Sequence, residues 1–380
     1  MKTSHNWRGT LTALAVVLFA VFATVSVFAN GAKEQTPKPQ PSTQQSTTTA
    51  TTPAPTAQTP AAPATQSVKP QYTLRFATVA GPQDQQTLSM NEFAKVVNEI
   101  SNGAVKVEVF PSGQLADQNT EILDVANGSI DMGDDASPSW FAADTNYPQI
   151  AVLEAPYLYS SLDEMYRVLL GPVGQQYWNT LEQKSGIKVL DVWYLGTREL
   201  DLTASAGPVT TPQQMHNVKL RMPNSATWLD VGRSLGANAT PLDFGEVYLA
   251  LKTGTIQGQD NPVPTDMTQK FFEVTKYLVL TNHMIGYVTP MINAKLWNSM
   301  PPEIQRDITT AMQIARNYNN YHVLLAEQTD IAKAEKQYGI KVVIPNQKAF
   351  MDYAKQYYSQ PKFDKMWGQG VYAKIQAMGE

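Results

Sequence analysis

One stretch near the end of the chain strongly limits the folds that it can form. After Pro302, no glycine or proline occurs before Gly339, and apolar residues recur at helical spacing throughout. Pro301, Pro302 and Glu303 are typical of a helix start. A helix over 302–338 would be about 55 Å long, which exceeds the width of one small domain. We therefore expect a long helix that braces two lobes.

The segment after residue 70 alternates predicted strands and helices. Strands are expected over 72–77, 105–109 and 130–134, with helical apolar patterns ending at Gly103 and Gly128 between them. This order is typical of a largely parallel sheet covered by helices, so the sequence predicts an α/β fold. Further expected elements are strands at 187–193, 218–222, 277–281, 287–292 and 340–344, and helices at 226–235, 246–253 and 349–358.

Two loops follow predicted strands and are candidate ligand sites, because parallel sheets bind ligands beyond the carboxyl ends of their strands. One is the turn at 78–83, and the other is the loop at 134–140. Adjacent aspartates such as Asp134 and Asp135 are most often a solvated loop. Their position after a strand, next to serines and Trp140, favours a role in binding.

Arg221 stands at the end of the predicted strand 218–222, just before Pro223. A guanidinium is planar and permanently charged, and it can hold a carboxylate with two parallel hydrogen bonds. The position therefore suits a site for an organic acid. From the strand alone, a structural ion pair is an equally good interpretation.

Several motifs occur in one order and at one spacing: 196–198 (GTR), 219–224 (KLRMPN), 240–251 (TPLDFGEVYLAL) and 258–262 (GQDNP). In these motifs the chain resembles the extracytoplasmic solute-binding proteins of TRAP (tripartite ATP-independent periplasmic) transporters, from about Thr73 to the C-terminus. The resemblance implies a two-lobed, periplasmic-binding-protein-like α/β fold with a ligand cleft between the lobes. It implies lobe I at 71–195 and 288–326, and lobe II at 196–287 and 327–380.

The resemblance also implies a function. Such a protein captures an organic acid and delivers it to the membrane permease subunits of a secondary transporter, with no cofactor and no ATP hydrolysis. Arg221 corresponds to the main carboxylate clamp and Arg198 to a second positive contact, while Glu246 and Tyr248 belong to the framework. The expected ligand-binding residues are Arg221, Arg198, Asn261, Asn224, Phe244, Asp134, Asp135, Val79 and Trp193.

Sialic-acid-binding members of the family carry polar residues where this chain has Val79 and Ala136. Sialic acid is therefore disfavoured. An ionised carboxylate only accepts hydrogen bonds, so Asp134 and Asp135 suit hydroxyl groups and repel a second carboxylate. We expect a sugar acid or hydroxy acid rather than a dicarboxylate.

The N-terminal residues indicate export. Lys2 and Arg8 precede an apolar run over 11–29 that ends in small residues. Since a helix of that length approaches the thickness of a bilayer, residues 1–32 are either a cleaved signal peptide or a membrane anchor. Residues 33–70 are rich in Pro, Thr and Gln, which predicts a disordered tether. A periplasmic or extracytoplasmic location follows in either case.

Composition excludes several classes of protein. The chain has no cysteine, so disulfides, thiolate metal sites and cysteine nucleophiles are ruled out. A formal charge of −4 without a basic cluster argues against nucleic acid binding. The four histidines lack metal-ligand spacing.

Two alternatives to a transport protein stay open. One is a secreted carbohydrate-active enzyme that uses Asp134, Asp135 or Glu246 as acid and base, although neighbouring strand residues point to opposite faces. The other is a sensor domain that presents its ligand to a signalling partner. No catalytic motif occurs in the sequence, so we expect no enzyme activity.

Overall fold

The computed structural model describes residues 69–135 and 137–378. The predicted signal peptide or anchor lies outside these residues, as do Ala136 and the predicted tether up to residue 68. Within the described ranges, no helix is long and apolar enough to cross a membrane.

The first sheet is mostly parallel at its N-terminal strands, as the alternating pattern predicts. The strand order is β2-β1-β3-β10-β4. Strand β1 pairs in parallel with β2 and β3, while β10 runs antiparallel to β3 and β4. The strands are β1 (Tyr72–Ala77), β2 (Val105–Phe110), β3 (Met132–Gly133), β4 (Ile187–Val189) and β10 (Met291–Asn293).

The second sheet is mixed and has the order β11-β9-β5-β8-β6-β7. Strand β5 pairs antiparallel with β8 and β9, and β6 runs parallel to β7 and β8. The strands are β5 (Trp193–Leu202), β6 (Lys219–Met222), β7 (Asn238–Pro241), β8 (Gly258–Pro262), β9 (Tyr277–Val288) and β11 (Lys341–Val343). Each sheet is the centre of one lobe. The exact lobe boundaries stay a prediction.

The two crossings between the sheets correct two predicted strands. The predicted strand 187–193 is divided, because β4 ends at Val189 in the first sheet and β5 begins at Trp193 in the second. The predicted strand 287–292 is divided at the second crossing, because β9 ends at Val288 in the second sheet and β10 begins at Met291 in the first. The predicted strand 277–281 is the first part of β9. Strand β9 continues beyond residue 281 through Asn282, where the backbone is irregular, with a φ of +45°. The Glu199 carboxylate stabilises this irregularity by accepting the Asn282 N–H at 2.7 Å.

Glycine is required where β5 passes β8. Gly196 has a φ of +122°, and a Cβ atom there would lie 2.5 Å from Cβ of Pro262. A side chain at 196 would therefore push apart the two strands that carry Arg198 and Asn261. This contact gives a physical reason for the glycine that precedes Thr197 and Arg198.

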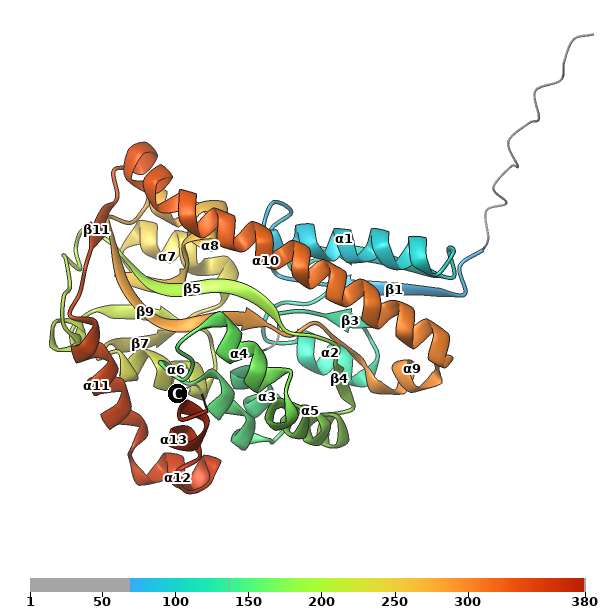
Figure 1. Cartoon of the computed structure of the whole chain (residues 1–380). Helices are drawn as coiled ribbons and strands as arrows, with labels where there is room; N and C mark the ends of the chain where they lie inside the picture. Colours follow the sequence, from blue (N-terminus) through green and yellow to red (C-terminus); the bar gives the residue numbers. More distant parts are fainter. Residues whose placement is uncertain (1–68, 136, 379–380) are drawn as a thin grey trace, which may run out of the picture. The chain divides into compact units, whose positions relative to one another are not determined.

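Helices cover both sheets (Figure 1). The α-helices are α1 (Gln85–Ile100), α2 (Glu121–Asn127), α3 (Pro138–Asp144), α4 (Leu162–Leu169), α5 (Pro172–Ser185), α6 (Ala226–Ser234), α7 (Val247–Thr253), α8 (Val263–Thr268), α9 (Ala294–Ser299), α10 (Pro302–Tyr338), α11 (Gln347–Tyr358), α12 (Pro361–Trp367) and α13 (Val371–Gln376). Short 3₁₀ helices are η1 (Pro148–Glu154), η2 (Pro212–Met215), η3 (Phe244–Glu246) and η4 (Phe271–Glu273).

Helix α10 has the predicted bounds and contacts both lobes. It lies beside α1 in Figure 1, and its N-terminal half packs Ile304 and Ile308 into the apolar cluster of β1 and α1. Its C-terminal half packs Ala334 against Phe272 and Leu278, which belong to the second lobe. The prediction of a bracing helix is confirmed, because one rigid element contributes to two separate cores.

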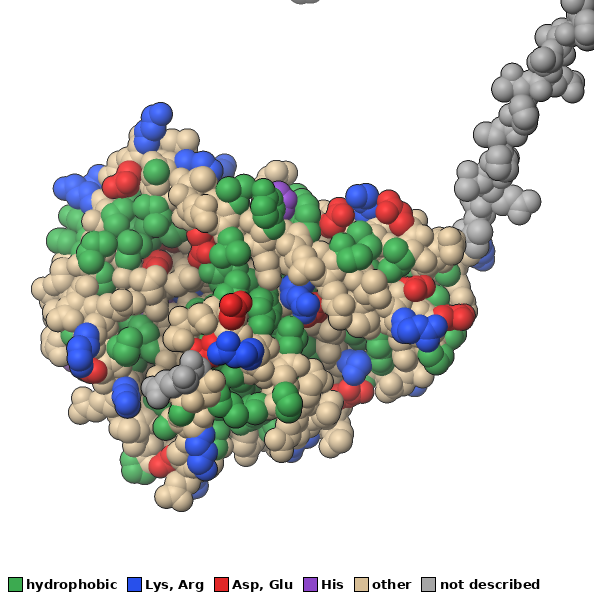
Figure 2. Space-filling model, viewed as in Figure 1, with side chains coloured by type: hydrophobic (Ala, Val, Ile, Leu, Met, Phe, Trp, Pro, Cys, Tyr) green, Lys and Arg blue, Asp and Glu red, His purple; other side chains and the backbone are tan. Residues whose placement is uncertain are grey.

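The visible face carries no continuous basic surface. Figure 2 shows Lys and Arg side chains scattered among neutral and acidic ones over this face of the described residues.

Candidate functional site

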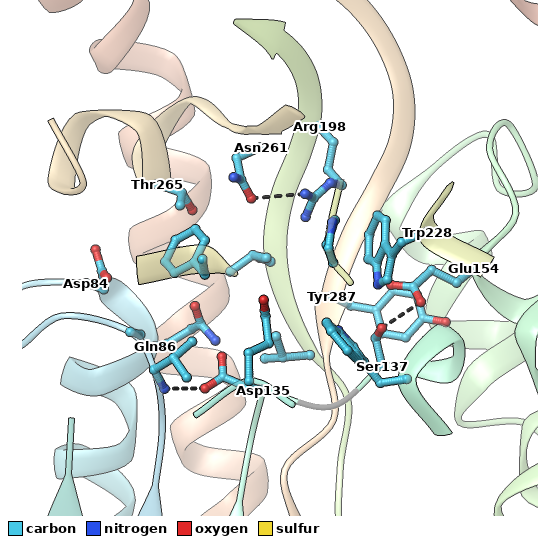
Figure 3. A pocket seen from close by; sticks show the side chains of 18 of the residues that line it. Asp84, Gln86, Asp135, Ser137, Glu154, Arg198, Trp228, Asn261, Thr265 and Tyr287 are labelled. Atoms are coloured by element: carbon cyan, nitrogen blue, oxygen red, sulfur yellow. Dashed lines mark hydrogen bonds between the residues drawn. The ribbon is translucent and has the colours of Figure 1, made fainter. Parts of the chain in front are cut away.

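A cavity lies where loops of the first sheet face strands of the second (Figure 3). The turn after β1 and the loop after β3 supply one wall. Strands β5, β6 and β8 supply the other wall through Arg198, Arg221 and Asn261. The lining residues are Val79, Ala80, Asp84, Gln86, Gln118, Asp135, Ser137, Trp140, Glu154, Leu195, Arg198, Arg221, Pro223, Trp228, Phe244, Asn261, Thr265, Tyr287 and Val288.

Arg221 is a buried cation without a carboxylate partner among the described residues. Its side chain is held by the Leu242 carbonyl, which accepts from Nε at 2.9 Å, and by Oε1 of Gln118, which accepts from Nη2 at 3.3 Å. The residue is 1% exposed, and burial lowers the pKa of its guanidinium to about 10. It is therefore still charged at neutral pH, and none of the described residues accepts from its Nη1. The structural ion pair that the strand position left open is absent in this part of the chain.

Arg198, unlike Arg221, is paired with a carboxylate of the protein. Its Nε donates to Oδ2 of Asp260 at 2.8 Å, and its Nη2 donates to the Asp260 carbonyl at 2.6 Å. The guanidinium also stacks 4.8 Å above the Trp228 ring. Burial alone would raise the pKa of Asp260, but the charge of Arg198 and the hydrogen bond from His283 bring it below its usual value. The charge of Arg198 is therefore compensated inside the protein.

A chain of amides fixes Asn261. Its Oδ1 accepts from Nη2 of Arg198 at 3.0 Å, and its Nδ2 donates to Oε1 of Gln259 at 2.6 Å. Gln259 in turn donates to Oδ1 of Asp266 at 2.7 Å. These bonds set the orientation of the Asn261 amide and leave one of its N–H groups for a ligand.

The first-lobe wall is acidic. Asp135 accepts the Thr78 hydroxyl at 3.1 Å and the Val79 N–H, and burial raises its pKa to about 6. Burial and the neighbouring carboxylates raise the pKa values of Glu121 and Asp134 well above the usual range. One oxygen from each of these three groups lies within 4.8 Å of the others.

This convergence corrects the expectation that Asp134 and Asp135 point to opposite faces of a strand. Strand β3 ends at Gly133, so strand alternation does not apply to the two aspartates. A Cβ at Gly133 would lie 2.4 Å from Oε1 of Glu121, so glycine is what allows this carboxylate to approach. By geometry the three groups could hold a cation, and their raised pKa values show that protons can also neutralise them.

Six of the nine predicted ligand residues line the cavity: Arg221, Arg198, Asn261, Phe244, Asp135 and Val79. Three do not. Asn224 is exposed next to the start of α6, and Asp134 is fully buried behind Asp135. Trp193 is 0% exposed in the apolar cluster of the first lobe, because β5 begins inside that core. Glu246 and Tyr248 also lie outside the cavity.

The structure adds residues that sequence reasoning missed, including Gln118, Glu154 and Trp228. They come from three separate segments, and no motif joins them. One feature of the sequence could have indicated that Glu154 is a functional residue. It is a lone carboxylate at the end of the apolar run 150–153, and such a residue is rarely buried without a purpose.

Comparisons with known proteins agree with this geometry. The 2,3-diketo-L-gulonate-binding periplasmic protein YiaO of Escherichia coli is 32% identical over 73% of this chain and 83% of its own length. The sialic acid-binding periplasmic protein SiaP of Vibrio cholerae is 29% identical over 82% of this chain and 94% of its own.

A solved structure is also similar. It is a TRAP periplasmic solute-binding protein from Roseobacter denitrificans with bound 3-deoxy-D-manno-oct-2-ulosonic acid. The two chains are 33% identical with a TM-score of 0.76, over 82% of this chain and all of the other. The model of bacterial extracellular solute-binding proteins, family 7 (DctP), matches residues 76–364. The chain therefore belongs to family 7 of the bacterial extracellular solute-binding proteins.

Proposed function

We propose that this protein captures a hydroxylated organic acid in the cavity between its lobes and delivers it to the membrane subunits of a TRAP transporter. One observation carries the proposal. Arg221 is a buried guanidinium in the cavity wall, and no described carboxylate forms a salt bridge with it. Burying a charge without a partner is costly, so the site is suited to a ligand that brings the missing carboxylate.

The acidic groups opposite Arg221 favour one carboxylate on the ligand over two. Asp84, Asp135 and Glu154 all line the cavity, and each lies on the first-lobe side. A second carboxylate would meet these groups, whereas hydroxyl groups can donate to them. A sugar acid or hydroxy acid therefore fits better than a dicarboxylate such as succinate.

Sialic acid remains disfavoured in this proposal. Val79 lines the cavity, and its N–H is already bonded to Asp135. An apolar side chain at this position offers no polar contact to a bulky, polar sugar. The similarity to a sialic acid-binding protein therefore extends to the family and not to the ligand.

We also propose that ligand is bound and not chemically changed. Asp135 and Glu154 are held by hydrogen bonds from their own lobe, which come from Thr78 and Ser137, and serve as acceptors for ligand hydroxyls. The enzyme alternative predicts product formation. Incubation of excess L-galactonate with the protein, followed by chromatography of the mixture, distinguishes the two.

The direct test is mass spectrometry of the ligand released when gently purified protein is denatured. We expect a hydroxylated monocarboxylate at up to one molecule per chain. Isothermal titration calorimetry then ranks L-galactonate, succinate and sialic acid, in this expected order of affinity. Tight binding of succinate, with none of L-galactonate or any other hydroxy acid, would refute the proposed ligand class. Tight binding of sialic acid would refute the proposal that this sugar acid is disfavoured.

A further inference from the structure

We infer that Glu154 and Trp228 form a hydroxyl-reading pair that decides which acids the cavity accepts. This inference rests on the proposed function and deepens it. Neither residue belongs to the motifs that place Arg198, Arg221 and Asn261. They come from opposite lobes, since Glu154 ends η1 and Trp228 lies in the first turn of α6.

The two side chains meet at one end of the cavity. Figure 3 shows both near Tyr287, at the end of the view away from Asp84. Both also neighbour Arg198, which stacks 4.8 Å above the Trp228 ring and whose charge acts on the Glu154 carboxylate. The common neighbour places the donor and the acceptor within reach of one ligand group.

Trp228 supplies an unused donor. The residue is 4% exposed, and its Nε1 is buried without a hydrogen-bond partner among the described residues. Buried indole N–H groups usually find an acceptor, because leaving one unpaired is unfavourable. A ligand oxygen in the cavity would provide it.

Glu154 supplies a half-used acceptor. Its Oε2 accepts the Ser137 hydroxyl at 2.6 Å and the Ser139 N–H at 2.9 Å, whereas the hydrogen bonds from the described residues leave Oε1 unengaged. The residue is 4% exposed and lines the cavity. Ser137 and Ser139 thus fix the carboxylate so that its other oxygen is kept for a ligand donor.

Only some chemical groups satisfy both side chains at once. A hydroxyl accepts from the Trp228 N–H and donates to Glu154. An ammonium group has no lone pair for Trp228, and a carboxylate next to Glu154 brings two negative charges together. A methylene group leaves both unsatisfied. The pair therefore selects a ligand that places a hydroxyl group beside Arg198, between Glu154 and Trp228.

The test uses three acids with six carbons in calorimetric titrations: L-galactonate, hexanoate and adipate. In Trp228→Phe, which keeps the ring under Arg198, we expect the affinity for L-galactonate to fall about fivefold to tenfold while hexanoate changes less than twofold. In Glu154→Gln, we expect L-galactonate to weaken about tenfold and adipate to strengthen by a similar factor, because the repulsion is removed.

Trp367→Phe is the matched control. Trp367 is 5% exposed, its Nε1 is also buried without a partner among the described residues, and it does not line the cavity. It should bind all three acids as wild type does. Thermal melting of each variant verifies folding, and either pair variant alone suffices for the test if the other does not fold.

Two failures are distinguishable. If wild type binds L-galactonate, Arg221→Lys abolishes that binding, and the pair variants keep the wild-type ratios among the three acids, the hydroxyl-reading pair is refuted while the proposed function stands. If wild type binds no hydroxy acid, or if Arg221→Lys binds as wild type does, the proposed function is refuted and the inference with it.

Discussion

The two walls of the cavity differ in the sign of their charged groups and in the partners that these groups have. On the second-lobe wall, acceptors organise the cations: Asp260 holds Arg198, and the Leu242 carbonyl holds Arg221. On the first-lobe wall, none of the described lysines and arginines forms a salt bridge with the carboxylates, and burial raises the pKa of Asp135 to about 6. The second-lobe wall therefore has a positive charge, on Arg221, without a salt-bridge partner among the described residues. The first-lobe wall has carboxylate oxygens that can accept hydrogen bonds from a ligand.

The difference gives the ligand a direction. In the proposed function, a ligand carboxylate would compensate Arg221, and ligand hydroxyl groups would donate to the acidic wall. Protein contacts already join the two lobes near the cavity, among them Gln118 with Arg221 at 3.3 Å, Asn119 with Asp243 at 2.9 Å, and Gln269 with Asp84 at 2.6 Å. A ligand that bonds both walls would add to these contacts and favour the closed arrangement.

The largest expected effect is on the framework cation of the second-lobe wall. Asp260→Asn leaves the buried Arg198 without a salt-bridge partner among the described residues, so the free energy of unfolding should fall by about 3–5 kcal/mol. Urea denaturation measures it. Glu92→Gln is the control, because Glu92 pairs with Lys95 at the surface and should cost less than about 1 kcal/mol. Equal losses of unfolding free energy in the two variants would show that the buried pair of Arg198 and Asp260 stabilises the fold no more than a surface ion pair does.

The second effect separates the ligand-binding cation from the framework cation. Arg221→Lys should weaken binding of L-galactonate by about 2–5 kcal/mol, since an ammonium cannot reproduce the planar fork. Its unfolding free energy should change little, because Arg221 has no internal carboxylate to lose. Calorimetry and urea denaturation of the same preparation test both halves. The exposed Arg233 offers Arg233→Lys as a control with wild-type affinity.

The smallest effect concerns the acidic wall and pH. Since the folded-state pKa of Asp135 is raised from 3.8 to about 6, the folded protein binds more protons than the unfolded chain between these values. Stability therefore falls as pH rises through this window. Asp135→Asn should remove about 2 kcal/mol of that fall. Urea denaturation at pH 4 and pH 7 measures it, and an unchanged fall would argue against Asp135 as its source.

Sequence reasoning predicted elements whose cause is local. Helix α10 follows from an unbroken run with a proline start and Gly339 at its end, and its bounds match the prediction. Strand β6 was predictable from alternation, so the position of Arg221 was as well. The motif resemblance brought Arg198 and Asn261 to the same cavity, where the structure also places them.

The rest depends on contacts that no local pattern records. Trp193 looked like a candidate beside the GTR motif, but β5 begins in the first-lobe core and buries it there. The strand predicted to end at residue 281 instead continues through Asn282, where Glu199, a residue 83 positions away, stabilises an irregular backbone. Glu154 and Trp228 come together only because two lobes face each other. Contacts between residues of different lobes could therefore not be predicted from the sequence.

A crystal structure with bound L-galactonate tests the central claim most directly. We predict that the ligand lies between the two walls, with its carboxylate within hydrogen-bond distance of Nη1 of Arg221 and a hydroxyl at the Glu154 and Trp228 end. A ligand carboxylate that contacts Arg198 alone, or a ligand bound outside this cavity, would contradict the assignment of Arg221 as the residue that anchors organic acids.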